Sequence, residues 1–268
     1  MLTSTFVLLQ GIGPCTERRL WQDGIVDWAS FLARPSVPGV SFSRKSCYDD
    51  RLVTAQSRLR AGRADYFGAC LKSRDHWRLF DAFRPRALYL DIETTGMSPR
   101  HGYVTVIGLC RGGRMSSLVM GENLTENRLH EELEQTDLFV TFFGSGFDIP
   151  FLQIAFPRLN WRKPHFDLCF AARRLGFHGG LKSIERELHI EREKAIEGLD
   201  GWDAVRLWQQ WCRGDEKALD LLLRYNAADT KNLELLAVTL YEQMVNRFGP
   251  PSVSVGYPTL LSTETSML

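Results

Sequence analysis

The chain has 268 residues, of which 44% are hydrophobic and 24% charged. This length and composition are typical of a packed globular protein and exclude a disordered or fibrous chain. Its six cysteines lie far apart, without the C-x-x-C or Cys/His spacing of a zinc site, so we interpret them as free thiols of a cytoplasmic protein. The apolar run near the N-terminus, residues 6–9, is too short for a signal peptide or a membrane span, and we expect no membrane association.

Positive charge is concentrated in the first third of the chain. Residues 1–85 contain 13 Lys and Arg against 8 Asp and Glu, net +5, whereas the remainder contains 20 against 24, net −4. Such a distribution suits a protein that binds phosphates with its front part and metal cations with the rest. An excess of this size also arises from random surface variation, and both interpretations stay open.

Breaks in the hydrophobic pattern divide the chain into four predicted parts. Residues 1–40 contain two short helical patterns around a glycine turn and end in a segment rich in breakers, residues 34–39. Residues 41–85 have apolar residues at helical spacing among Arg and Lys, which predicts two or three linking helices. Residues 86–248 are predicted to form the core domain, and residues 249–268, with little periodicity, a flexible tail.

The predicted core domain opens with strands and continues with alternating helices and strands. Its first three strand patterns, separated by turn residues, predict an antiparallel meander over 87–90, 103–109 and 115–120. The expected elements that follow are a helix over 126–134, a strand over 138–142, a helix after Asp148, an extended piece at 165–168, and helices to 248. The order β-β-β-α-β-α-β-α predicts an α/β fold, a mixed sheet flanked by helices, and resembles the ribonuclease H-like architecture.

Two acids, Asp91 and Glu93, close the first strand of this domain, just before a glycine turn. Residues two apart in a strand project from the same face, so the two carboxylates lie side by side. Neighbouring carboxylates repel each other unless a cation lies between them, and hard ions such as Mg²⁺ and Mn²⁺ prefer such oxygen ligands. The pair therefore predicts a metal site.

Further acids occur where additional ligands are needed. Asp148 comes two residues before Pro150, a spacing typical of the first turn of a helix. Tyr225 and Asp229 are four residues apart and share one face of a predicted helix. Each feature alone has an ordinary alternative, namely a solvated turn, a helix cap or a surface pair. Their combination and order predict one shared site.

These residues resemble the motifs of the DEDD 3′-to-5′ exonucleases of the ribonuclease H-like superfamily. The family's three motifs, D-x-E, a second ending in F-D, and Y-x-x-x-D, match Asp91 with Glu93, Phe147 with Asp148, and Tyr225 with Asp229. A histidine subgroup has His where this chain has Arg224, so the chain resembles the tyrosine, or DEDDy, subgroup.

Within that subgroup the chain looks most like the YprB-like domain proteins, through residues 91–96, 179–185 and 225–229. The resemblance covers about residues 86 to 245. One position departs from it: the family usually has Asn five residues before the acid of its second motif, and this chain has Phe143. A contact near the scissile nucleotide is therefore expected to be lost or remade.

The resemblance implies a 3′–5′ exonuclease that hydrolyses single-stranded nucleic acid with two divalent metal ions, Mg²⁺ or Mn²⁺. We favour single-stranded DNA as the substrate, and RNA stays open because the sequence does not decide between them. It implies one metal on Asp91, Glu93 and Asp229, and a second on Asp91 with Asp148 reached partly through water. Tyr225 and Glu93 would orient the attacking water. The sequence does not indicate an oligomeric state.

The turn after the first motif is a candidate contact for the terminal nucleotide. Its amides, from Thr94, Thr95, Gly96 and Met97, are available to hold that nucleotide, and Met97 to pack against its base. The alternative is a plain turn that ends the strand.

Three other side chains are candidate nucleic-acid contacts, each with an ordinary alternative. Phe147 and Phe151 are suited to stacking on bases, although aromatics beside a helix start are more often core residues. Lys182, at a helix start, is placed to touch a phosphate or is simply exposed. His165 and Asp167 are either groups that support the site or, for Asp167, the cap of the next helix.

The glycine turn near the N-terminus, with Gly11 and Gly13, resembles a helix-hairpin-helix motif, in which backbone amides bind one phosphate. Pro14 suits the first position of the second helix. Glu17 stands where a small residue is usual. The alternative is a helical hairpin that only packs against the rest of the protein.

Two rival functions remain open at this stage. One is a non-catalytic nucleic-acid-binding protein on the same scaffold, against which the complete set of acids argues. The other is a structure-specific endonuclease, against which Tyr225 argues. A dinucleotide-binding domain is disfavoured because no G-x-G-x-x-G follows a strand and opens a helix.

Overall fold

The computed structural model describes residues 1–251. Almost all of the predicted tail, residues 252–268, lies outside the described residues. The helices of the described part are η1 (Leu2–Ser4), α1 (Pro14–Gln22), α2 (Trp28–Leu32), α3 (Phe42–Arg60), α4 (Ala64–Cys70), η2 (Ser73–Leu79), α5 (Phe80–Phe83), η3 (Arg84–Arg86), α6 (Glu126–Glu134), α7 (Asp148–Ala155), α8 (Leu168–Leu175), α9 (Leu181–Glu187), α10 (Gly201–Trp211) and α11 (Glu216–Phe248).

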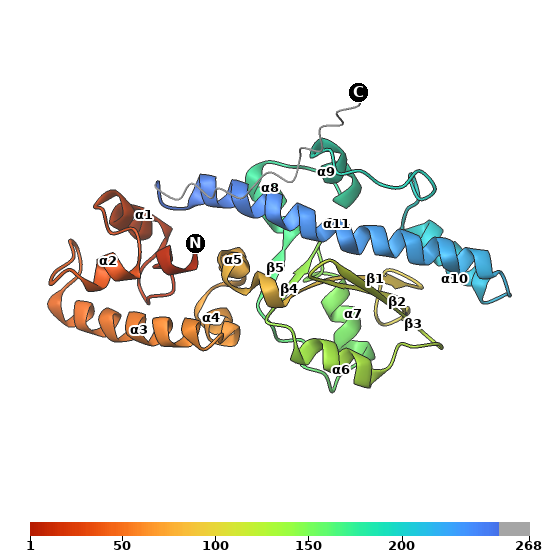
Figure 1. Ribbon diagram of the computed structural model, residues 1–268, viewed down its shortest axis with the longest axis horizontal. Coiled ribbons are helices and arrows are strands. Elements are labelled where there is room, and N and C mark those ends of the chain that lie inside the picture. Colours follow the sequence, from red (N-terminus) through yellow and green to blue (C-terminus); the bar gives the residue numbers. More distant parts are fainter. Residues whose placement is uncertain (252–268) are drawn as a thin grey trace, which may run out of the picture.

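One mixed sheet forms the centre of the second half of the molecule, with strand order β3-β2-β1-β4-β5 (Figure 1). The strands are β1 (Ala87–Thr94), β2 (Val104–Arg111), β3 (Arg114–Val119), β4 (Leu138–Thr141) and β5 (His165–Asp167). Strands β1, β2 and β3 are antiparallel neighbours, whereas β4 runs parallel to both β1 and β5. The fold class predicted from the sequence is therefore confirmed.

The side chains of β1 alternate between two hydrophobic clusters on opposite faces of the sheet. Leu88 and Leu90 belong to the cluster that includes residues of α6 and α7, whereas Tyr89 belongs to the cluster that includes residues of α8 and α11. Figure 1 shows α11 across one face of the sheet and α6 and α7 against the other. By the two-residue period of a strand, Asp91 and Glu93 share the face of Tyr89 and point toward α11.

Helix α11 approaches the sheet very closely at one point, and a glycine makes this possible. Gly108 of β2 is paired with Asp91 of β1. A Cβ atom at Gly108 would collide with Asn226 and Thr230 of α11. The absence of a side chain there brings the middle of α11 down onto the strand pair that carries the acids.

The N-terminal helices share a core with the end of α11. Buried residues such as Leu2 and Phe6 belong to the same cluster as Tyr241 and Val245 of α11. The same cluster also includes Leu52 of α3. The predicted division into a unit of residues 1–40 and linking helices therefore stays a prediction, because the buried residues of both parts pack together.

The helix expected before the glycine turn is absent, which corrects the sequence analysis. Only η1 precedes the turn, and residues 5–13 are not helical. The backbone groups there pair with side chains instead: the amides of Phe6 and Val7 donate to Oε1 of Glu17 at 2.6 and 3.1 Å, and the indole of Trp21 donates to the Ser4 carbonyl at 3.0 Å. These contacts replace the hydrogen bonds that a helix would make.

Glu17, which departs from the helix-hairpin-helix pattern, is buried and paired. Its carboxylate accepts two hydrogen bonds from the guanidinium of Arg78, at 3.1 and 2.8 Å. Burial raises the pKa of Glu17, while Arg78 and the amides of Phe6 and Val7 lower it. Because all these donors favour the charged form, the pair links α1 to η2 as a buried ion pair.

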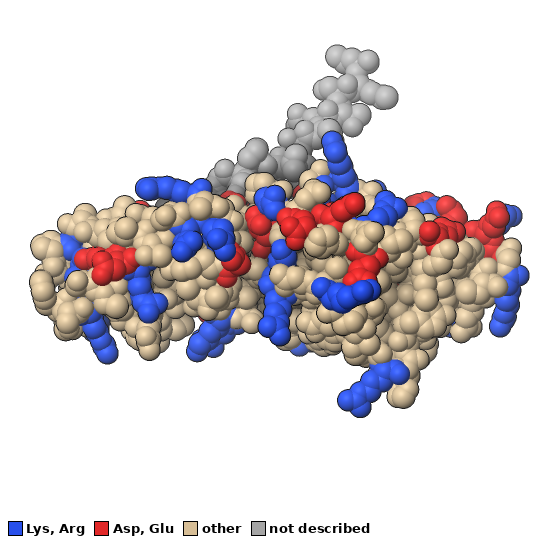
Figure 2. Space-filling model, turned by 90° about the horizontal axis from the view of Figure 1, so that it is seen from below, with Lys and Arg blue, Asp and Glu red and all other residues tan. Residues whose placement is uncertain are grey.

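Charges of both signs cover the surface. On the face seen in Figure 2, Lys and Arg lie over both halves of the molecule, with Asp and Glu among them. The basic excess of the first 85 residues therefore does not form a single patch on this face. All six cysteines are unpaired. Among residues 1–251, no helix combines the length and the apolar character needed to cross a membrane.

Candidate metal centre and cleft

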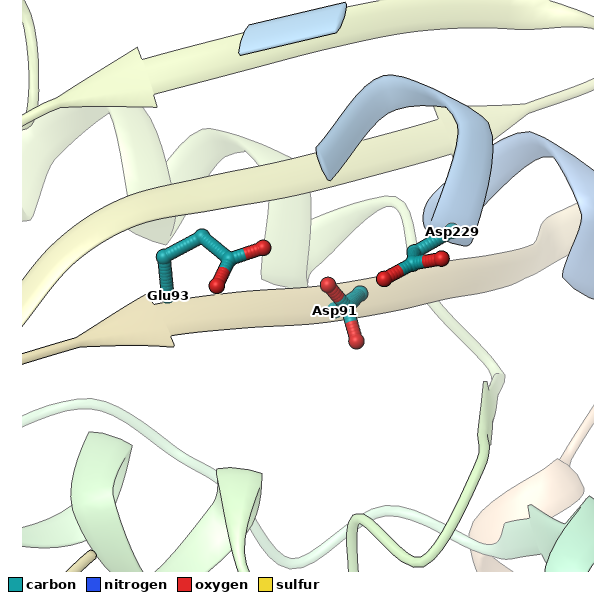
Figure 3. A group of neighbouring side chains, drawn as sticks. All are labelled: Asp91, Glu93 and Asp229. Carbon is teal, nitrogen blue, oxygen red and sulfur yellow. The ribbon is translucent and has the colours of Figure 1, made fainter. Parts of the chain in front are cut away.

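Three of the predicted acids meet in space. Asp91, Glu93 and Asp229 each offer a carboxylate oxygen, and these oxygens all lie within 4.8 Å of one another. Figure 3 shows Asp91 and Glu93 on β1 and Asp229 on α11, with their carboxylates close together. The second half of β1 and the middle of α11, far apart in the sequence, supply one acidic cluster.

Asp148 lies in the same cleft but outside this group of three oxygens. It is the first residue of α7, is 4% exposed and lines the cleft with the other acids. Its pKa is raised to about 7, chiefly by burial and also by the charge of Asp167, against backbone hydrogen bonds that lower it. The helix start predicted for this residue is confirmed.

The cluster carries more negative charge than its surroundings neutralise. Burial, followed by the charges of Asp229, Glu93 and Asp148, raises the pKa of Asp91 well above its usual range. Burial and Asp229 do the same to Glu93. Carboxylates this close and this buried repel each other, so a cation placed between them lowers the free energy of the ionised form.

Two residues that the sequence analysis did not single out also contact the acids. The amide of Asn226, which is fully buried, donates to Oδ2 of Asp91 at 2.9 Å. Arg192, from the loop between α9 and α10, places Nη1 at 2.5 Å from Oδ1 of Asp229 and donates through Nε to the buried Glu185 at 2.5 Å. Asn226 lies inside a quoted motif, but nothing in the sequence indicates Arg192.

Arg192 only partly satisfies Asp229. The contact is close enough for an ion pair, yet Oδ1 of Asp229 has no hydrogen-bond partner among the described residues. Arg192 also shares its charge with Glu185. Burial raises the pKa of Asp229, and the charge of Arg192 lowers it.

Tyr225 and Lys182 form a pair beside the acids. Lys182 Nζ donates to the phenol oxygen of Tyr225 at 2.9 Å and also to the carbonyl of Leu199. Burial, followed by the charges of Asp229, Glu93 and Asp91, raises the pKa of Tyr225. The phenol is therefore protonated at neutral pH, and because Lys182 occupies its oxygen, its own proton is directed elsewhere.

Lys182 is thus not freely exposed, and its contact with a phosphate stays a prediction. It lines a small cavity of about 350 Å³ next to Tyr225, Asp91 and Asp229. Its ammonium also lies 4.4 Å from the centre of the Tyr225 ring. The position makes Lys182 a residue that holds Tyr225 in place.

A cleft of about 450 Å³ opens over the acids. Thr94, Gly96 and Met97, from the predicted turn, line one side of it, and Met97 is 72% exposed. Thr95 does not line the cleft; it forms two hydrogen bonds with Tyr103, each 3.0 Å long. Three of the four predicted turn residues therefore face the cleft, and the fourth holds the turn closed.

The two candidate stacking phenylalanines have different positions. Phe147 lines the cleft, whereas Phe151 is 2% exposed and belongs to the core beneath the sheet. Their rings lie 4.9 Å apart, so Phe151 supports Phe147 from below. For Phe151 the structure favours the core alternative.

Phe143 also lines the cleft and has an unusual backbone. Its φ of 63° lies in the left-handed region, which bulky residues rarely adopt. Asn is several-fold enriched in that region, which gives a physical reason for the Asn that the resembled family has here. The backbone amide of Phe143 donates to Asp167 at 2.9 Å.

Trp202 is a cleft residue that sequence reasoning missed. It is the second residue of α10, is 60% exposed and lines the cleft together with Val205. A tryptophan early in an amphipathic helix gives no signal of its own, because such residues are mostly core. Its exposure marks it only in the structure.

The remaining candidates lie outside the cleft. Asp167 caps α8 by accepting from the Cys169 amide at 3.2 Å, which confirms the cap interpretation. His165 contacts Thr141 Oγ1 at 2.8 Å, and burial lowers its pKa to about 4. Gly11 and Gly13 precede α1, at the opposite end of the molecule from α10 (Figure 1).

Residues 88–241 match the family described as the RNase_H superfamily, and because this match spans more than half of the chain, the chain belongs to that superfamily. Comparison with curated proteins finds no match.

Several solved structures are similar in fold. A structure described as "apo form of the nuclease" shares 22% identity over 66% of this chain and 79% of its own, with a TM-score of 0.47. Brucella melitensis NrnC bound to pGG shares 23% over 63% and 77%, with a TM-score of 0.45. The family B DNA polymerase from the hyperthermophilic archaeon Pyrobaculum calidifontis shares 16% over 57% of this chain and 24% of its own, with a TM-score of 0.48. All three identities are below 25%, so they do not indicate a substrate.

Proposed function

We propose that this protein is a metal-dependent 3′–5′ exonuclease acting on single-stranded nucleic acid. The observation that carries the proposal is the cluster of Asp91, Glu93 and Asp229, whose oxygens lie within 4.8 Å of one another in a cleft that Asp148 and Tyr225 also line. Membership of the RNase_H superfamily supports it.

The donor set fits divalent metal ions. It consists of carboxylates, the ligands that Mg²⁺ and Mn²⁺ prefer. Its excess negative charge favours the binding of a cation. Asp91, Glu93 and Asp229 would hold one ion, and Asp91 with Asp148 a second. When bound, two such ions lower the pKa of an attacking water and neutralise charge on the phosphate and the leaving oxygen.

Tyr225 and Glu93 would orient the attacking water. The phenol keeps its proton at neutral pH, because burial and three carboxylates raise its pKa. Lys182 donates to the phenol oxygen, which leaves the phenol proton as the donor toward a water beside the acids. Glu93 supplies an acceptor on the other side. Such positioned groups fix the direction of attack.

The walls of the cleft suit one unpaired nucleotide. Met97, Phe143 and Trp202 are large apolar side chains that are 72%, 42% and 60% exposed, and all three line this cleft. Exposed apolar groups gathered at one cleft indicate a binding surface. A base removed from its neighbours stacks well on such groups, whereas a paired base is not available for stacking.

The test is digestion of matched DNA and RNA strands labelled at either end, with Mg²⁺ or Mn²⁺. A 3′–5′ exonuclease releases the 3′ label as a mononucleotide at once and shortens a 5′-labelled strand stepwise. Release of the 5′ label first would contradict the proposed polarity. The preference for DNA over RNA stays a prediction that the same assay measures.

Two control substrates and one control protein separate the rival functions. Cutting of circular single-stranded DNA would favour the endonuclease. A wild-type protein that binds strands but cleaves none, with either metal, would favour the non-catalytic binding protein. Asp229→Asn serves as the control for contaminating nucleases, because it removes one acid of the cluster without changing the size of the side chain.

A further inference from the structure

A second and larger cavity, of about 600 Å³, lies beside the cleft. Its walls come from η2, from β5, from α8 and from the loop before α7, and they include Arg74, Lys163, Ser145, Phe170, Arg173 and Arg174. None of the four acids of the metal centre lines this cavity. We call it the basic pocket.

One loop forms the wall between the basic pocket and the cleft. Phe143, at the start of this loop, lines the cleft, and Ser145, two residues later, lines the basic pocket. Asp167 holds both: it accepts from the Phe143 amide at 2.9 Å and from the amide and hydroxyl of Ser145 at 3.1 and 2.6 Å. The wall is therefore a fixed structure in spite of its exposed position.

Two exposed rings lie at the edge of this wall. Phe143 is 42% exposed and Phe170, of the basic pocket, is 44% exposed. Their ring centres are 6.1 Å apart with the planes tilted by 45°. Phe143 keeps this position although its left-handed backbone is strained, with φ at 63°. Strain retained at an exposed aromatic is typical of a functional position.

The charge of the basic pocket is positive and largely unneutralised. Four cationic side chains line it, together with the carboxylate of Asp167, whose two oxygens are occupied by the loop and by the cap of α8. One of the four, Arg74, also has Asp75 within 3.6 Å. Within the described residues, Lys163 and Arg173 form no ion pair with a carboxylate. The four cations outnumber the two carboxylates, Asp167 and Asp75, so the pocket attracts anions.

Arg174 lines this pocket, and two contacts fix the position of its guanidinium. Its Nη1 donates to the carbonyl of Arg74 at 2.8 Å, and its guanidinium lies 4.6 Å from the centre of the Phe248 ring. Burial lowers the pKa of Arg174; Asp75 raises it, and Arg78 and Arg74 lower it further. Neighbouring guanidinium groups thus repel one another here, and a bound anion would relieve that repulsion.

We propose that the basic pocket binds phosphates of the substrate strand upstream of its terminal nucleotide, and that the strand passes over Phe143 and Phe170 between the two cavities. This inference rests on the proposed function, since it makes the strand that enters the metal centre also the occupant of the pocket. Cations would bind the backbone and the two rings would stack on bases, a combination typical of sites for single strands.

The consequence is an affinity that grows with strand length. A dinucleotide places its terminal nucleotide in the cleft and is too short to reach the basic pocket. A longer strand reaches both. Phosphate contacts release counterions, so the pocket adds to the salt dependence of binding, by about 0.7 in the slope of log affinity against log salt for each contact on a single strand.

The experiment compares two double variants, each lacking two cations. Lys163→Ala with Arg173→Ala removes two cations of the basic pocket. Arg213→Ala with Lys217→Ala removes two exposed cations, one between α10 and α11 and one in the first turn of α11, that line none of the three cavities. Both are made in full-length protein carrying Asp91→Asn, so that strands stay intact. Binding of a labelled thymidine octanucleotide is followed by fluorescence anisotropy, and an unlabelled dinucleotide is used as competitor.

The pocket variant is expected to bind the octanucleotide about tenfold more weakly and with a salt slope smaller by about 0.7 to 1.4, while the control stays within about twofold of its parent. The affinity for the dinucleotide, measured by competition, should be the same in the two variants. Equal octanucleotide affinity in the two variants, or an equal loss for dinucleotide and octanucleotide, overturns the proposal. Arg173→Glu, a single exposed change, provides the same test should the double variant not fold.

The outcome is independent of the proposed activity. Cleavage polarity is measured with wild-type protein and end-labelled strands, whereas the length dependence is measured with protein that carries Asp91→Asn. A protein that fails to release a 3′ label but shows the length-dependent loss would lose its proposed function and keep the basic pocket. The reverse result would keep the function and remove the pocket.

Discussion

The two ends of the molecule both bury charged side chains, but they do so in opposite ways. In the N-terminal part, Glu17 is buried and accepts two hydrogen bonds from Arg78 and two from backbone amides. At the end of β1, several acids are buried together, and only Lys182 and Arg192 stand near them. The buried charge of Glu17 is fully paired, whereas the acids at the end of β1 keep an excess of negative charge.

The difference separates structure from function. A paired and hydrogen-bonded buried charge contributes to holding elements together, and removing one partner leaves the other uncompensated. A buried group of like charges lowers stability on its own and persists where it serves another purpose. Neutralising one charge should therefore have opposite effects on stability at the two ends.

The largest effect is expected from Asp91→Asn, measured both as turnover and as Tm without metal. Loss of a shared ligand should reduce the cleavage rate about a thousandfold, since metal ions contribute several kcal/mol to such reactions. The Tm should rise, because a repelling charge is removed. Asp220→Asn, on the exposed face of α11, is the control and should change neither. A lowered Tm for Asp91→Asn would contradict the excess of charge.

Glu17→Gln tests the other side of the comparison. Arg78, 3% exposed, would lose its closest carboxylate and keep two longer contacts, with Asp75 at 3.5 Å and with the Thr5 hydroxyl at 3.4 Å. Breaking a buried pair in this way should lower the free energy of unfolding by about 3 kcal/mol, measured by urea denaturation. Asp65→Asn, in the exposed pair with Arg63, should leave the midpoint unchanged. Equal midpoints for the two variants would show that the buried pair contributes nothing.

Tyr225→Phe distinguishes an orienting group from a structural neighbour within the acidic end. The variant should keep metal and substrate affinity but lower kcat by about a hundredfold, the usual contribution of a positioned proton-transfer group. Asp229→Ala should lose metal binding as well. Tyr66→Phe, on α4, is the matched control. Cleavage by Tyr225→Phe at the wild-type rate would remove the assignment to the tyrosine subgroup.

Because of the acids of the metal centre, the stability of the folded protein should also depend on pH and on bound metal. Because the pKa values of Asp91, Glu93 and Asp148 are raised in the folded protein, that of Asp148 to about 7, the folded state binds more protons than the unfolded state. Stability of the metal-free protein should therefore fall as the pH rises from about 4 to 8. Added Mn²⁺ should raise the Tm more at pH 8 than at pH 5, and Asp91→Asn should reduce this difference. Equal metal effects at both pH values would count against a carboxylate metal centre.

The smallest effect concerns the backbone of Phe143. Phe143→Asn should raise the free energy of unfolding by about 1 kcal/mol, because Asn adopts the left-handed region at lower cost. Phe170→Asn removes the same ring contact from a helical position and should not stabilise. A stability gain for both would mean that loss of the rings, and not relief of strain, is responsible.

The sequence predicted the sheet and the acids well because both follow from local rules. The two-residue period of β1 predicts that Asp91 and Glu93 share a face, and the four-residue spacing on α11 predicts the same for Tyr225 and Asp229. The order of elements then determines at which edge of the sheet these two faces come together. Their convergence is a consequence of topology that the resemblance also implied.

The parts that the sequence did not predict depend on contacts between distant segments. Arg192 and Trp202 reach the site from the loop after α9 and from the start of α10, where no periodicity constrains them. The helix expected before Gly11 is replaced by hydrogen bonds in which Glu17 accepts from the Phe6 amide and Trp21 donates to the Ser4 carbonyl. Phe147 and Phe151 are four residues apart and have similar sequence neighbours. Only the packing of α7 makes the first a cleft residue and the second a core residue.

The length of α11 gives the site an order of assembly during synthesis. Asp91, Glu93 and Asp148 leave the ribosome early, whereas Tyr225 and Asp229 belong to the last helix of the described chain. A chain interrupted before α11 carries the first three acids without the two residues that complete the centre, and it also lacks the helix that covers one face of the sheet. Under the proposed function, the nascent chain acquires the means to cut nucleic acid only after α11 has been made.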